Sequence, residues 1–186
     1  MVPNLYPAFE RQEVVIHSPE HIRSFAELDD EQVALVAQAW TERDAPFALI
    51  NEGRLAGASL PHSHSQLVWT DPPEESLDRL PELLHPLEVA RRGGVVAAVH
   101  PFGAGPYECL VAGDGSLADG LVLLRDLVRR LQEVEGLRPW NAWLHPRPPW
   151  HLHFVPRLTA IAGIELGVGI YVNVLPPEQA AERLRG

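Results

Sequence analysis

Apolar positions recur along this chain at two spacings, which separate expected helices from expected strands. Residues 29–43 and 121–134 repeat apolar side chains every three or four positions, the spacing of a helix with one buried face. A further helix is expected at 176–184. Short apolar or alternating runs predict strands at 13–17, 47–51, 94–100, 107–111, 141–145, 151–155 and, interrupted by glycine, 167–174.

Helix-end signals support the three helices. Asp29, with Gln32 three positions later, has the spacing of a capping box. Gly136 is placed to end the second helix. Pro176-Pro177-Glu178 opens the last one, because a proline in the first turn loses no intrahelical hydrogen bond. A further helical stretch is expected from Glu74 in the acidic, proline-broken segment.

The predicted elements repeat in the same order. Each half has a strand, a helix, a strand and then a strand with a His-x-His pair: FALIN precedes HSHSQLVW, and NAWLH precedes WHLHFV. The pattern predicts an internal duplication with halves at 1–84 and 85–186. Short strands and one long helix per half favour an α+β fold, an antiparallel sheet backed by helices.

Composition narrows the classes of function. The chain has 186 residues and a formal net charge of −10, which argues against a nucleic-acid partner. It contains no lysine, so a lysine Schiff base and a P-loop lysine are excluded. Its single cysteine excludes an intrachain disulfide and a Cys-x-x-Cys zinc site. With no long apolar run, we expect a cytoplasmic protein without a membrane partner.

The chain between Asn51 and Trp69 concentrates polar and small residues. Strand alternation places His62, His64 and Gln66 on one face. Before them lies a small-residue loop, where backbone N–H groups and a hydroxyl can hold a phosphate; its members are Gly53, Gly57, Ala58 and Ser59. Separately, the two features fit an ordinary exposed strand and an ordinary turn. Together they favour a site.

A second histidine group lies in the C-terminal half. His151 and His153 share a strand face, and His145 precedes them by one short loop. Three imidazoles suit a divalent transition metal, although an interface strand without metal fits the same pattern. The other histidines at 17, 85 and 100 are expected at the surface or at strand ends, and Cys109 is expected to be a small buried residue.

Several motifs resemble one enzyme family. The string Asn51-x-Gly53, Ala56-Gly57-Ala58-Ser59, Pro61-His62-x-His64-x-Gln66 resembles the active-site segment of galactose-1-phosphate uridylyltransferases, within the histidine-triad superfamily. Residues 2–8, 18–21, 150–154 and 165–185 are similar to other parts of that family. The resemblance therefore runs in order over almost the whole chain, and implies a unit of two histidine-triad-like halves.

The resemblance also implies a chemistry. The family moves a uridylyl group from UDP-glucose to a histidine and then to galactose 1-phosphate, and the motif places that nucleophile at His64. Its second ring nitrogen should donate to a fixed acceptor, such as a backbone carbonyl of the same strand. Gln66 and Ser59 match phosphate contacts, and the remaining substrate-binding positions are Asn4, Asn51 and Gly57. A homodimer is the analogous assembly.

Metal binding follows the same resemblance. One structural zinc or iron ion, and no organic cofactor, is expected, with ligands from His145, His151, His153 and either Glu74 or Glu75. The family's N-terminal cysteine pair has no counterpart in this sequence. A second, weaker site would therefore retain His21 and His62 alone.

The resemblance leaves the substrate open. A positively charged residue that typical members carry before the Glu165 region is replaced here by Thr159-Ala160-Ile161-Ala162. Two other functions therefore stand beside uridylyl transfer. One is an adenylyl-transferring phosphorylase or hydrolase, acting on a dinucleoside polyphosphate or an ADP-sugar. The other is a non-catalytic nucleotide-sugar binding protein.

Overall fold

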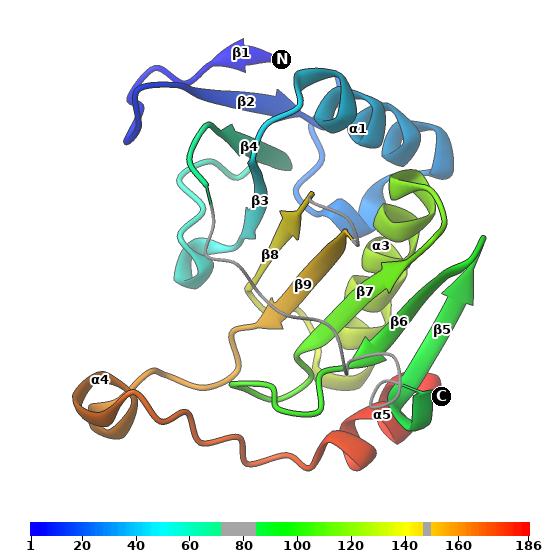
Figure 1. Cartoon of the computed structure of the whole chain (residues 1–186). Coiled ribbons are helices and arrows are strands. Elements are labelled where there is room, and N and C mark those ends of the chain that lie inside the picture. Colours follow the sequence, from blue (N-terminus) through cyan, green and yellow to red (C-terminus); the bar gives the residue numbers. More distant parts are fainter. Residues whose placement is uncertain (72–84, 147–149) are drawn as a thin grey trace.

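One antiparallel sheet organises the protein. The computed structural model describes residues 1–71, 85–146 and 150–186 (Figure 1). Their nine strands form a sheet in the order β1-β2-β4-β3-β8-β9-β7-β6-β5. Every neighbouring pair among these strands is antiparallel. The predicted α+β class is confirmed.

The elements have the following bounds. The strands are β1 (Val2–Pro3), β2 (Gln12–Ile16), β3 (Phe47–Glu52), β4 (His64–Val68), β5 (Glu88–Arg92), β6 (Val95–Val99), β7 (Cys109–Gly113), β8 (Trp140–His145) and β9 (His151–Pro156). The α-helices are α1 (Asp30–Arg43), α3 (Leu117–Glu135), α4 (Gly163–Val168) and α5 (Pro177–Arg185). Single 3-10 turns are η1 (Phe25–Glu27), η2 (Arg54–Ala56) and η3 (His85–Leu87). No helix in the described ranges is both long and apolar enough to span a membrane.

The core lies between the sheet and its helices. Figure 1 shows α3 lying across one side of the sheet, with α1 beside it. Ile50 and Leu67 point to this side and join one apolar cluster with residues of both helices, such as Val33 and Leu124. Each fully buried leucine or valine of this kind stabilises the fold by roughly 1.5–3 kcal/mol. The opposite face of the sheet is therefore available for polar side chains.

The register of the central strands is repeated. In the first half, β3 pairs with β4 so that Leu49 lies opposite Gln66. In the second half, β8 pairs with β9 so that Trp143 lies opposite His153. The two strand pairs meet where β3 runs antiparallel to β8. Internal duplication, with halves at 1–84 and 85–186, remains a prediction.

Helix ends agree with the capping signals, with one shift. Asp29 and Gln32 form the predicted capping box, and Gly136 ends α3 with φ +76°. However, α3 begins at Leu117, because the Ser116 hydroxyl accepts from the Asp119 N–H at 3.0 Å. The apolar pattern misses this first turn, since only part of it faces the core.

Two strand predictions need correction. Residues 167–174 do not form a strand: α4 covers the first of them and ends at Gly169, which has φ +74°. The chain beyond it lies outside the sheet, with Tyr171 exposed. Strand β7 starts two residues later than predicted, because Tyr107 has a positive φ of 59° and interrupts the extended backbone. Strand β5 was not predicted, and the helix expected from Glu74 lies outside the described residues.

Candidate active site and metal centre

His64 and Gln66 lie on the sheet face away from the helices. In β4, the alternate residues Ser65 and Leu67 point to the helices: Trp40 of α1 donates its indole N–H to the Ser65 hydroxyl at 2.9 Å. Strand alternation then places His64 and Gln66 on the other face. Opposite them in β2 are Ile16 and Val14. The predicted common face is confirmed for His64 and Gln66, whereas His62 precedes β4 and is not part of the strand.

The His64 ring is held by its own strand. His64 is almost buried, and its Nδ1 lies 2.8 Å from the backbone oxygen of His62. A carbonyl oxygen only accepts, so Nδ1 carries the proton and Nε2 keeps its lone pair. In the neutral ring, this contact selects the tautomer that has its proton on Nδ1 and its lone pair on Nε2. This bond is the backbone acceptor expected from the sequence.

A cavity of about 40 Å³ opens beside His64. Its lining includes Asn51, Gly53, Ala58 and His62. The volume is close to that of one water molecule, roughly 30 Å³. It thus marks the immediate surroundings of the imidazole rather than a complete substrate pocket. Asn4, Ser59 and Gln66 are not part of this lining.

An asparagine from the other half ties down the small-residue loop. Asn141 in β8 lies directly opposite Asn51 and donates from its Nδ2 to Asn51 Oδ1 at 2.7 Å. The same nitrogen donates to the Ala56 oxygen at 2.8 Å. Gly57 follows at φ +88°, a backbone conformation that favours glycine. Sequence reasoning missed Asn141, whose one signal is its place on the same strand face as His145.

Gln66 is oriented by a residue that sequence reasoning also missed. Gln12 in β2 donates its amide N–H to Gln66 Oε1. Because the carbonyl side is occupied, the NH₂ group of Gln66 is the part left to meet a ligand. Asn4 lies farther from Gln66, and its backbone N–H donates to the backbone oxygen of Gln12 at 2.9 Å. Ser59 is exposed in the loop.

His21 and His62 come together as the resemblance implies. Their Nδ1 atoms are 3.2 Å apart, and His62 Nε2 lies 3.1 Å from the Ser18 oxygen. Two nitrogens bound to one tetrahedral zinc, each about 2.0–2.1 Å from the ion, are separated by about 3.3 Å. The pair thus has the spacing of two ligands.

His17 corrects the expectation of a surface residue. It is buried, and its Nδ1 lies 2.9 Å from the Ser63 hydroxyl oxygen. Burial, reinforced by the neighbouring imidazoles of His64 and His62, lowers the pKa of His17 to about 3. His17 is therefore neutral and helps to hold the strand that carries the candidate nucleophile. His100 is partly buried and stacks on His153, whereas His85 is exposed as expected.

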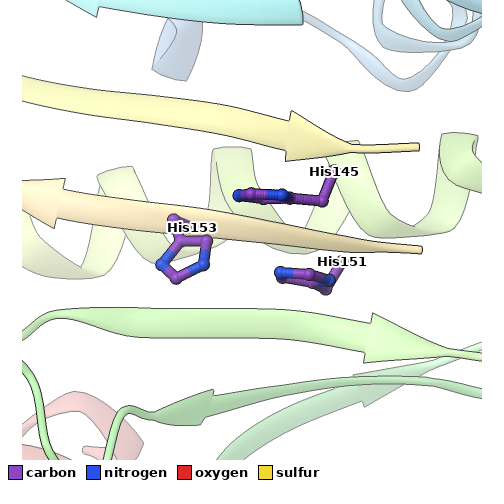
Figure 2. Close-up of side chains that lie close together, drawn as sticks. All are labelled: His145, His151 and His153. Atoms are coloured by element: carbon purple, nitrogen blue, oxygen red, sulfur yellow. The ribbon is translucent and has the colours of Figure 1, made fainter. Parts of the chain in front are cut away.

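The C-terminal histidines form a compact cluster. Figure 2 shows His145 from β8 beside His151 and His153 from β9. One ring nitrogen of each lies within 4.8 Å of the others. His151 and His153 are only 3% and 4% exposed. Two buried imidazoles and one partly buried imidazole fit a zinc or iron ion in number and in type of ligand. The predicted carboxylate ligand, Glu74 or Glu75, lies outside the described residues.

Trp143 braces this cluster. Its indole stacks on the His153 ring, with centroids 4.7 Å apart and planes 9° from parallel. Its Nε1–H donates to His145 Nε2 at 3.0 Å. Trp143 also lines a cavity of about 680 Å³ on the same sheet face, together with Asn51, Asn141 and Arg157. Asn51 lines both this cavity and the smaller one beside His64, and His153 lines the larger one.

Comparison with known sequences points to one family of nucleotidyl transferases. Residues 7–72 match the family model "Galactose-1-phosphate uridyl transferase, N-terminal domain". An ADP-glucose phosphorylase from Arabidopsis thaliana is 25% identical, over 100% of this chain and 73% of the relative. A galactose-1-phosphate uridylyltransferase from Streptomyces lividans is 28% identical, over 98% of this chain and 71% of the relative.

Solved structures share the fold. An Arabidopsis thaliana ADP-glucose phosphorylase with bound ADP-glucose superposes with a TM-score of 0.85, at 23% identity, covering 98% of this chain and 80% of the other. A uridylyltransferase superposes with a TM-score of 0.83, at 22% identity, covering 98% and 78% respectively. The fold of this chain is thus shared with an ADP-glucose phosphorylase and with a uridylyltransferase.

Proposed function

We propose that this chain, a member of the galactose-1-phosphate uridylyltransferase family, transfers a nucleotidyl group between a nucleotide sugar and a phosphate acceptor through His64. In the leading form, UMP moves between UDP-glucose and a hexose 1-phosphate such as galactose 1-phosphate. The observation that carries the proposal is the 2.8 Å contact from His64 Nδ1 to the His62 backbone oxygen, which in the neutral ring places the lone pair on Nε2. A histidine that only bound substrate would not require this tautomer.

The proposed reaction consists of two successive displacements at the same phosphorus atom. His64 Nε2 attacks the α-phosphorus of the nucleotide sugar, and the bond from that phosphorus to the bridging oxygen breaks. The sugar 1-phosphate leaves with the electron pair. A phosphate oxygen of the acceptor then attacks the same phosphorus, and the phosphorus–nitrogen bond breaks to regenerate the neutral imidazole. No external oxidant or reductant is needed.

Neighbouring residues stabilise the charge on the transferred phosphate. The NH₂ group of Gln66 and the hydroxyl of Ser59 act as hydrogen-bond donors to its oxygens. Asn51 and Gly57 shape the loop on the substrate side, and Asn4 contributes through Gln12 and Gln66. Fixed donors of this kind stabilise the transition state without reorganising.

One structural metal ion per chain completes the proposal. His145, His151 and His153 would hold a zinc or iron ion, with Glu74 or Glu75 as the fourth ligand. The ion would cross-link β8 and β9 and would take no part in the transfer reaction, because the cluster lies in the other half of the sheet from His64. It therefore contributes to folding stability.

A second candidate is an ADP-sugar phosphorylase. It is favoured by the relative of that name, which this chain matches over its whole length. In such an enzyme His64 and Gln66 would have the same roles, whereas the nucleotide base and the acceptor would differ. The absence of lysine and of any basic residue at 158–164 fits an acceptor site different from that of typical uridylyltransferases.

Intact-protein mass spectrometry tests both candidates. The protein is incubated with UDP-glucose or with ADP-glucose, and a mass increase of one uridylyl or one adenylyl group identifies the donor. His64→Ala is expected to abolish the adduct, whereas His85→Ala, which removes an exposed imidazole elsewhere, is expected to leave it unchanged. No adduct with either donor, or an adduct that survives in His64→Ala, would contradict the proposal.

A further inference from the structure

Glu108 lies against the metal-cluster residue His153. It precedes β7, where Leu110 sits directly opposite His153 of β9. Alternation places Glu108 on the same sheet face as Leu110. Its Oε1 is 3.9 Å from His153 Nδ1, and the two side chains are only 9% and 6% exposed. A carboxylate and an imidazole thus share one buried space.

A buried carboxylate requires compensation. An isolated one is strongly disfavoured away from water, so it needs hydrogen-bond donors or a nearby positive group. Glu108 Oε2 accepts from the Ala104 N–H at 2.6 Å. Among the described residues, His153 is the one basic side chain that forms a close pair with this carboxylate. The second oxygen of Glu108 is therefore directed at an imidazole.

Stacking fixes the plane of the His153 ring but not its rotation within that plane. Trp143 lies on the ring with centroids 4.7 Å apart, and His100 stacks at 6.2 Å. Neither contact selects which nitrogen faces His145 and His151. A hydrogen-bond acceptor beside Nδ1 does select the orientation of the ring, because Nδ1 then carries the proton and Nε2 offers the lone pair.

We propose that Glu108 is a positioning residue for the metal centre: its carboxylate accepts a hydrogen bond from the Nδ1–H of His153, directly or through one water, and so leaves the Nε2 lone pair to bind a metal ion. The inference rests on the metal part of the proposed function. A carboxylate behind a ligand imidazole orients the ring and raises its basicity, and its loss weakens metal binding by about 10–100-fold.

The test measures metal affinity with the full-length chain. After removal of metal by a chelator, Zn²⁺ is returned in competition with a chromophoric chelator. Glu108→Gln keeps the shape and an oxygen that accepts the Ala104 N–H, so the unfolding temperature of the metal-free protein is expected to stay unchanged. Zn²⁺ affinity is expected to fall by about 10–100-fold.

Glu52→Gln is the matched control. Glu52 is another largely buried carboxylate that accepts a backbone N–H, from Phe25 at 2.7 Å, and it belongs to the first half of the sheet. Its replacement is expected to leave Zn²⁺ affinity unchanged. An equal loss of affinity in both variants would show a general structural effect and overturn the inference.

A double-mutant comparison isolates the pair. In a His153→Ala background, Glu108→Gln is expected to cause no further loss of affinity, because the ring on which it acts is gone. Unchanged affinity in Glu108→Gln alone would refute the role of Glu108 and leave the metal centre standing. If the unaltered chain bound no Zn²⁺, the metal centre and the role of Glu108 would both be refuted. The His64 adduct would still test the transfer reaction separately.

Discussion

Asn141 in β8 donates to Asn51 in β3 and to the Ala56 oxygen, at 2.7 and 2.8 Å. One side chain from the C-terminal half therefore fixes the loop that precedes the candidate nucleophile. The two strands belong to different predicted halves, so the site beside His64 depends on both.

The first prediction concerns this contact. Asn141→Asp keeps the size of the side chain but replaces the donor by a carboxylate facing two oxygen atoms. Each lost hydrogen bond costs about 1 kcal/mol, and the charge adds repulsion, so the rate of adduct formation is expected to fall by at least roughly tenfold. Rapid-quench mass spectrometry measures that rate. Gln38→Ala, which removes an amide donor on the exposed face of α1, is the control and is expected to match the unaltered protein.

The second prediction is exchange without an acceptor. A covalent intermediate at His64 must outlive the departing glucose 1-phosphate, so labelled glucose 1-phosphate should enter the donor nucleotide sugar. Initial rates with both substrates varied should give parallel double-reciprocal lines. His62→Ala is expected to slow exchange without abolishing it, because His64 Nδ1 is held by the backbone oxygen of residue 62. Absence of exchange with a folded protein and its correct nucleotide would indicate direct transfer.

The third prediction concerns pH. The pKa of His17 falls from 6.5 to about 3 on folding, so the unfolded chain binds more protons between these values. The contribution of His17 to the free energy of unfolding is therefore fully present above pH 6.5, and it is lost as the pH falls toward 3. At about 1.4 kcal/mol per pKa unit, the fall of about 3.5 units between the unfolded and folded chain corresponds to roughly 5 kcal/mol.

Urea unfolding from pH 4 to 7 tests this prediction. The quantity compared is the difference in free energy of unfolding between the unaltered chain and His17→Asn. The difference cancels other groups, including Glu52, whose raised pKa acts in the opposite direction because burial disfavours its charge. The free energy of unfolding of His17→Asn is expected to depend less steeply on pH. Parallel curves would show that His17 does not titrate as described.

The fourth prediction concerns metal content. Elemental analysis of protein purified without chelators is expected to find at most one well-occupied ion per chain, because His21 and His62 alone leave an ion open to solvent. Removing the ion should lower the unfolding temperature more than it lowers turnover per folded molecule. His151→Ala should remove the ion, and His21→Ala should not. Two ions, one of them lost in His21→Ala, would mean that other ligands complete the N-terminal site.

Local signals in the sequence predicted much of this structure. The Asp29 cap, the Gly136 stop and the alternation of His64 with Gln66 each depend on residues a few positions apart, and the structure confirms them. The strand predicted at 167–174 was wrong because an apolar, glycine-spaced run does not specify a neighbouring strand, and none pairs with it in the described sheet.

The supporting residues depend on distant pairing. Gln12 meets Gln66 only because β2 lies beside β4, and Asn141 meets Asn51 only because β8 lies beside β3. Glu108 reaches His153 through the pairing of β7 with β9. Strand order and register over such separations are not contained in local periodicity. Burial of His17 escaped prediction for the same reason, since Ser63 and Phe25 enclose it from other segments.

The repeated register has a consequence for redesign. Since Leu49 faces Gln66 and Trp143 faces His153, position 66 in one strand pair corresponds to position 153 in the other. Two residues earlier in each outer strand stand His64 and His151, and two residues later in each inner strand stand Asn51 and His145. One scaffold geometry therefore presents an Asn-His-Gln trio on one side and three imidazoles on the other. Replacing two side chains, through His145→Asn and His153→Gln, would reproduce the first trio in the second strand pair and turn the candidate metal cluster into a copy of the surroundings of His64.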